Sequence, residues 1–92
     1  MYSLKNKNMK YTTDQQNVFV RDVTGRSYVY SNTITVNELM RQLSRNIGIP
    51  VRKQSLVYAG RHLSNYNYYD KRLVDLGVRP NTTISVTIKM IG

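Results

Sequence analysis

Apolar and polar residues alternate along two short stretches of this chain, and a turn sequence separates them. Val18 and Val20 fall on one face of the stretch NVFVRDV. Tyr28 and Tyr30 fall on one face of RSYVYS, a few residues later. A period of two is typical of a half-buried strand. Gly25 lies between the stretches and can adopt the positive φ that short hairpin connections need. The pattern predicts two antiparallel strands joined by a tight turn.

The spacing of apolar residues changes to that of a helix after Thr35. Glu38 follows Thr35 by three residues, and this pair predicts a capping box in which the threonine hydroxyl accepts from the first-turn amides while the carboxylate reaches back. Gly48 is suited to end the segment in the left-handed conformation. We predict one helix over roughly 36–46. Its apolar residues share one face: Val36, Leu39, Met40, Leu43 and Ile47.

Two later stretches have the composition of strands. Residues 55–59 read SLVYA and precede Gly60, which predicts a short strand closed by a turn. Residues 82–90 read TTISVTIKM, a β-branched run in which alternate residues are apolar. Between the two strands, three apolar residues anchor irregular chain: Leu73, Leu76 and Val78.

Residues 1–16 differ from the rest of the chain. They are rich in Asn, Gln, Lys and Thr and show no sustained period, which predicts a disordered, basic and polar tail. Residues 17–92 contain no linker or repeat, so we expect one domain there. There is no cysteine, no apolar run long enough to span a membrane and no secretory leader. We expect an intracellular monomer, cytoplasmic or nuclear, that does not act at membranes.

The predicted elements coincide with specific sequence words. V-F-V precedes T-G, G-I-P follows the helix, and L-V-Y-A-G and D-L-G-V precede a final T-I-x-V strand. With these words the chain resembles the ubiquitin-like, β-grasp family over about residues 17–92. The resemblance implies an α+β fold in which a four- to five-stranded mixed sheet packs on one helix. Relative to the family, the chain is about two residues shorter around Asn32 and about four longer between Leu63 and Leu73, where loops tolerate length changes.

The resemblance also assigns a core. Tyrosines replace aliphatic residues in its second strand, so their hydroxyls need partners. The expected core residues are Val18, Val20, Tyr28, Tyr30, Val36, Leu39, Leu43, Leu56, Leu63, Leu73, Val78, Ile84 and Val86.

Members of the family are recognised through a hydrophobic patch on the sheet. We call the matching positions in this chain the sheet patch: Val23, Val57, Gly60, Ser85 and Thr87. We expect Arg61, beside the patch, to contribute to partner binding. Serine and threonine make this patch smaller and more polar than the family's. An ordinary solvated sheet face remains the alternative.

The C-terminal residues resemble the tail through which family members are conjugated to other proteins. They are Lys89, Met90, Ile91 and Gly92. A conjugated modifier ends in two glycines, so a modifier role requires processing and conjugation at Gly92 or at a following glycine. The positions of the family's chain-building lysines lack lysine, so we do not expect polymeric signalling. They hold Arg21, Arg26, Met40, Gln42, Asn46, Arg61 and Pro80.

The chain lacks the residue patterns of an enzyme. His62 is its one histidine, best interpreted as an exposed structural residue, and the acids are isolated. No glycine loop for phosphate occurs, and no metal cluster is expected. We predict a non-catalytic protein-interaction domain without a cofactor.

Charge leaves one alternative open. The chain carries 14 Lys+Arg against 5 Asp+Glu, a net charge of +9 that favours acidic partners. Residues 64–72, the tyrosine-rich loop, combine aromatic and cationic side chains, a composition that stacks on single-stranded bases. The alternative function is therefore a basic nucleic-acid-binding module, with a protein partner favoured.

Overall fold

The two N-terminal strands pair as the predicted hairpin. The computed structural model describes residues 16–90. In it, β1 (Asn17–Arg21) runs antiparallel to β2 (Ser27–Ser31). Val18 and Val20 are fully buried while their neighbours along β1 are not, which is the alternation expected of this strand.

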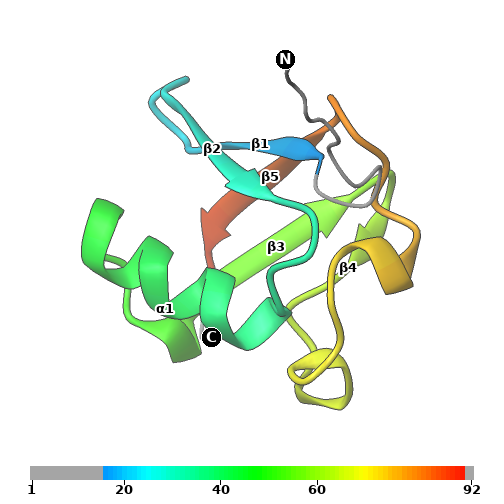
Figure 1. Cartoon of the computed structure of the whole chain (residues 1–92). Helices are drawn as coiled ribbons and strands as arrows, with labels where there is room; N and C mark the ends of the chain where they lie inside the picture. Colours follow the sequence, from blue (N-terminus) through cyan, green and yellow to red (C-terminus); the bar gives the residue numbers. More distant parts are fainter. Residues whose placement is uncertain (1–15, 91–92) are drawn as a thin grey trace.

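The remaining strands extend the hairpin into a mixed sheet (Figure 1). β5 (Thr83–Ile88) is parallel to β1, and β3 (Gln54–Tyr58) is antiparallel to β5. A two-residue strand, β4 (Arg61–His62), pairs with the end of β3. The order across the sheet is β2-β1-β5-β3-β4. The predicted α+β, β-grasp fold is confirmed, with five strands in the sheet.

The helix α1 (Val36–Ile47) covers one face of this sheet (Figure 1). It begins after Thr35, whose hydroxyl accepts from the Glu38 N–H at 3.2 Å, and it ends at Gly48 with a φ of 81°. The predicted end at residue 46 falls one residue short of the observed end. Short 3₁₀ helices occur in the connections, at Val51–Lys53, Tyr66–Tyr68 and Val74–Leu76.

Helix and sheet enclose one apolar core. Its buried residues are Val18, Val20, Tyr30, Val36, Leu39, Met40, Leu43, Leu56, Leu63, Leu73, Val78, Ile84 and Val86. Of the expected core, only Tyr28 is half-buried, and Met40 joins from the predicted apolar stripe of the helix. The side chains of Asn32 and Gln54 are also buried, which the sequence pattern did not predict.

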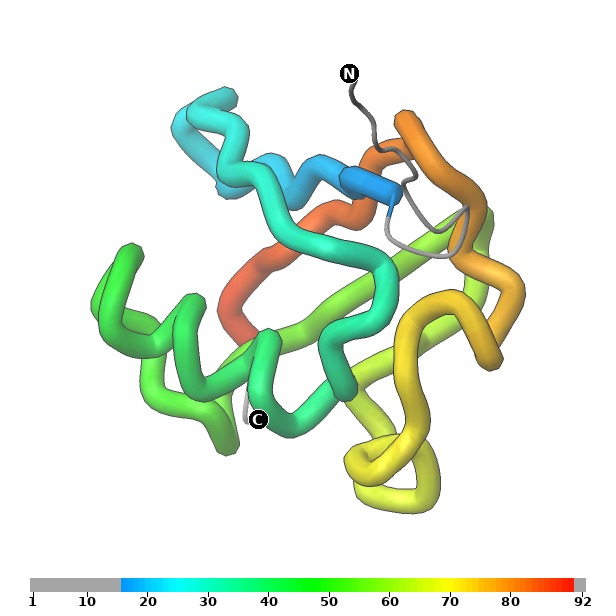
Figure 2. Tube along the Cα trace, viewed as in Figure 1, coloured from blue at the N-terminus to red at the C-terminus, as the bar shows by residue number. Residues whose placement is uncertain are grey.

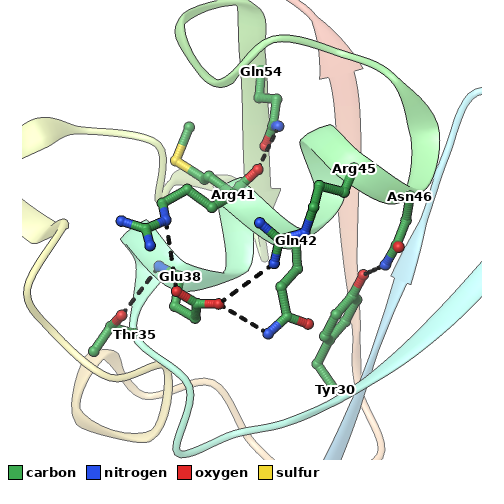
Figure 3. A network of polar contacts seen from close by, with 9 residues as sticks. Tyr30, Thr35, Glu38, Arg41, Gln42, Arg45, Asn46 and Gln54 are labelled. Atoms are coloured by element: carbon green, nitrogen blue, oxygen red, sulfur yellow. Dashed lines mark hydrogen bonds and ion pairs between the residues drawn. The ribbon is translucent and has the colours of Figure 1, made fainter.

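The predicted capping box is only half formed (Figure 3). The Glu38 carboxylate does not reach back to Thr35. It accepts from Gln42 Nε2 at 3.1 Å and faces the guanidinium groups of Arg41 and Arg45 at 3.7 and 3.9 Å. The prediction was wrong here because three donors further along the same helix face attract the carboxylate more strongly than one backbone N–H does.

Buried Gln54 ties β3 to the helix (Figure 3). Its Nε2 donates to the backbone carbonyl of Met40 at 2.7 Å and to that of Ile49 at 2.9 Å. Its Oε1 is buried and has no hydrogen-bond partner within residues 16–90. The two donated bonds fix how the end of the helix and the following turn sit on the sheet.

The tyrosines of β2 both find hydroxyl partners. The Tyr30 hydroxyl accepts from Asn46 Nδ2 at 2.7 Å, which joins β2 to the last turn of the helix (Figure 3). The Tyr28 hydroxyl donates to Asp22 at 3.3 Å. These bonds offset the cost of removing the hydroxyls from water.

The tyrosine-rich loop ends against the start of the helix (Figure 2). The carbonyl of Lys71 accepts from the Val36 N–H at 2.9 Å, and that of Tyr69 accepts from the Asn37 N–H at 3.0 Å. First-turn amides have no partner within their own helix. Because this loop supplies those partners, it is attached to the core at its C-terminal end.

The predicted tail, residues 1–16, falls mostly outside the described residues. Gln16 is described, and it continues the pairing of β1 with the end of β2. The Asn32 N–H donates to the Gln16 carbonyl at 2.7 Å, and the Gln16 N–H donates to Asn32 Oδ1 at 3.3 Å.

A charge at Leu43 should destabilise the protein strongly. Leu43 is fully buried on the helix face that meets the sheet, so in Leu43→Glu we expect a loss of about 3 kcal/mol or more in the free energy of unfolding. Arg45→Gln, on the exposed face, should change it by about 0.5 kcal/mol or less. Urea denaturation measures both, and similar losses would mean that the helix is buried through another face.

The near-isosteric change Gln54→Met should cost about 1–3 kcal/mol, because it removes two buried donors and leaves the Ile49 carbonyl without its bond. Gln42→Met, on the partly exposed helix surface, is the matched control, with an expected change of about 0.5 kcal/mol. Thermal and urea unfolding would test this. Equal stability of Gln54→Met and wild type would show that the buried amide contributes nothing.

Candidate protein-interaction surface

The face of the sheet opposite the helix carries a row of aligned residues. Strand register places Arg21 beside Ser85, Ser85 beside Val57, and Val57 beside His62, from β1 across β5 and β3 to β4. Val57 is half-buried and the other three are exposed. The row is therefore an apolar side chain flanked by small polar and basic groups.

The fold brings two residues of the sheet patch directly together and places a third nearby. Val57 and Ser85 are partners in the register, and Thr87 lies two residues further along the same face of β5, opposite Ser55. Val23 is 69% exposed in the turn after β1. Because β1 and β5 are parallel, this turn lies toward the same end of the sheet as Thr87.

Gly60 shapes the turn between β3 and β4. Ala59 and Gly60 have φ values of 50° and 80°, both in the left-handed region, as in the two-residue turns that suit antiparallel strands. This turn sets His62 opposite Val57. Gly60 therefore contributes to the sheet patch through its backbone conformation, which forms this turn.

His62, and not Arg61, lies beside the sheet patch in the structure. Arg61 lies opposite Tyr58, so its side chain leaves β4 on the other side from His62. Its guanidinium donates to the backbone carbonyl of Leu76 and so holds the segment before β5. His62, interpreted from the sequence as a structural residue, is the one that adjoins Val57. Only the pairing of β4 with β3 could reveal this.

The Asp22 carboxylate organises the turn that presents Val23. Its Oδ1 accepts from the Thr24 hydroxyl at 2.6 Å and from the backbone N–H groups of Thr24 and Arg26 at 2.9 and 3.1 Å. These bonds, led by that of the Thr24 hydroxyl, hold the pKa of Asp22 below its ordinary value. A charged group thus fixes one end of the sheet patch.

The proposed conjugation tail is described in part. The Lys89 N–H donates to the Lys53 carbonyl at 2.7 Å, which extends the pairing of β5 with β3. Met90 is 92% exposed. Ile91 and Gly92 lie outside the described residues.

The tyrosine-rich loop exposes only part of its aromatic surface. Tyr66 is 77% exposed, whereas Tyr68 and Tyr69 are half-buried against the core. Arg72 forms two bonds with Asp75 at 2.9 and 3.1 Å, and this arginine lowers the pKa of Asp75. The cluster expected to stack on bases is thus partly used to hold the loop in place.

Comparison with protein families agrees with the arrangement of helix and sheet. The sequence model of the ubiquitin family matches residues 18–91. The chain belongs to the ubiquitin family. Domains of the ubiquitin family are generally non-enzymatic and generally bind protein partners. Within residues 16–90 of this member, no helix has the length and apolar character needed to cross a membrane.

Replacing Asp22 with asparagine should destabilise the fold at neutral pH and have less effect in acid. Because its pKa is lowered, the carboxylate contributes stability above its ordinary pKa of 3.8, and this is lost as the pH falls through the folded-state pKa. The difference in unfolding free energy between wild type and Asp22→Asn, measured in urea at about pH 7 and about pH 2.5, should therefore shrink in acid.

Asp70→Asn is the control for that experiment, because Asp70 is exposed and lies outside the turn. We expect it to have little effect at either pH. A difference for Asp22→Asn as large in acid as at neutral pH would contradict a role for the charge.

Proposed function

We propose that this member of the ubiquitin family is a non-catalytic recognition domain whose sheet patch binds a protein partner. The observation that carries the proposal is the row on the outer sheet face, where Val57 stands among Ser85, Arg21 and His62. The helix covers the other face, so this is the broad surface of the sheet that a partner can reach.

The composition of the row favours a partner that presents an apolar side chain surrounded by acidic residues. Burying Val57 and Val23 would supply apolar area, and the small side chains of Ser85 and Thr87 allow close approach. Arg21 adds positive charge to the row, in keeping with the net charge of +9. Conjugation through the C-terminal residues would be an additional use of the domain, and recognition does not depend on it.

The change Val57→Asp tests the proposal. It should reduce partner binding at least about tenfold, because a carboxylate cannot replace the apolar contact, while the fold survives since Val57 points away from the core. Val29→Asp is the matched control, because Val29 is 56% exposed on the edge strand β2, three strands away from β3.

The three forms of the chain would serve as baits in a cell extract, with bound proteins quantified by mass spectrometry and folding checked by thermal unfolding. Partners should bind wild type and Val29→Asp and be lost from Val57→Asp. Equal retention by all three would refute the sheet patch as the binding surface. Strong low-salt retention on single-stranded RNA, unaffected by Val57→Asp, would favour the nucleic-acid function instead.

A further inference from the structure

An open pocket of about 470 Å³ lies where the outer sheet face meets the tyrosine-rich loop. One wall comes from the sheet and the segment that follows it, through Ser55, His62 and Lys89. The other wall comes from the tyrosine-rich loop, through Ser64, Asn65, Tyr66 and Tyr69. The pocket is therefore formed jointly by the sheet and this loop.

The loop wall offers hydrogen-bond donors. The Ser64 hydroxyl oxygen accepts from the Leu56 N–H at 3.0 Å, which leaves its O–H to donate. Asn65 Oδ1 accepts from the Asn67 N–H at 2.9 Å, which leaves the amide nitrogen of the Asn65 side chain to donate. The Ser64 O–H and the Asn65 side-chain N–H groups can therefore donate to a ligand.

The sheet wall adds positive charge. Lys89 lines the pocket, and its backbone bond to Lys53 places a second lysine beside it at the end of the sheet. No carboxylate is among the described residues that line the pocket.

We infer that this pocket is a subsite for an anionic side chain, carboxylate or phosphoryl, on the protein partner. The inference rests on the proposed function. His62 joins the two sites, because it lines the pocket and is paired with Val57 in the sheet. An extended segment crossing the sheet face would place an apolar side chain on Val57 and an acidic one in the pocket.

A peptide fits these features better than a nucleic acid does. Lys89 and the exposed ring of Tyr66 could serve either ligand. Val57 is paired with His62 of the pocket lining, however, and an apolar side chain has no counterpart on a phosphate backbone. The occupant that uses both features is an acidic segment with a neighbouring apolar residue.

The test uses the full chain, isotope-labelled, and follows its amide chemical shifts during titration. The probes are a short synthetic peptide with leucines followed by glutamates, the same peptide with phosphoserines or with glutamines in place of the glutamates, and an oligothymidylate. Lys89→Gln removes the charge from the pocket. Lys71→Gln is the matched control, because Lys71 is exposed in the same loop and outside the pocket lining.

We expect at least one acidic peptide to shift the amides of Ser64, Asn65 and Val57. Which of the two binds more tightly distinguishes carboxylate from phosphoryl. Lys89→Gln should weaken that peptide about five- to tenfold, and Lys71→Gln about twofold or less. The glutamine peptide should bind more weakly than the glutamate peptide. Its affinity should change little in Lys89→Gln, because it carries no negative charge to interact with the lysine.

Several results would overturn the inference. Equal weakening by Lys89→Gln and Lys71→Gln would indicate diffuse attraction between net charges, and unshifted pocket amides would show an empty pocket. Tighter binding of the oligothymidylate, with the greater loss on Lys89→Gln, would assign the pocket to nucleic acid. Val57→Asp separates the two proposals. If acidic peptides still bind Val57→Asp but lose affinity for Lys89→Gln, the pocket binds them and the sheet patch does not. If they lose affinity for Val57→Asp but not for Lys89→Gln, the sheet patch binds them and the pocket does not.

Discussion

Burial of one helix face against one sheet face is the constraint on which the rest of this structure depends. The apolar stripe of α1 and the inward residues of the strands exclude water from a single core. With one face of the sheet covered in this way, partners must approach the other face and the loops at its edges. The row centred on Val57 is available for recognition because Leu56 and Val86, beside it in the same strands, point to the helix.

Specific polar bonds set the position of the helix on that core. Apolar contacts are nondirectional, so by themselves they would allow the helix to slide over the sheet. Hydrogen bonds are directional and fix its position. Gln54 binds the carbonyls of Met40 and Ile49 from β3, and Asn46 binds the hydroxyl of Tyr30 on β2. The end of the helix is thereby bonded to two strands, β2 and β3, that lie toward opposite edges of the sheet.

The tyrosine-rich loop connects this framework to the candidate site. At its C-terminal end, backbone carbonyls of the loop accept from the first turn of the helix. At its N-terminal end, Ser64 is bonded to β3 and Asn65 to its own turn. Anchored at both ends, the loop holds a donor-rich wall at a fixed place beside the sheet patch.

Residue patterns predicted the helix and the four longer strands, because strand and helix periods depend on neighbours a few residues apart. The approximate extent of the helix and the faces of β1 and β5 could be predicted in this way. The sheet patch positions came from the resemblance to the family and not from these periods. The tertiary structure alone decided that Gln54 is buried, that Glu38 turns to the arginines, and that His62 rather than Arg61 adjoins Val57. It also decided that Lys89 meets the tyrosine-rich loop in one pocket. These outcomes depend on strand pairing and on loop positions that are set by residues far apart in the chain. The local spacing of residue types contains no information about such contacts.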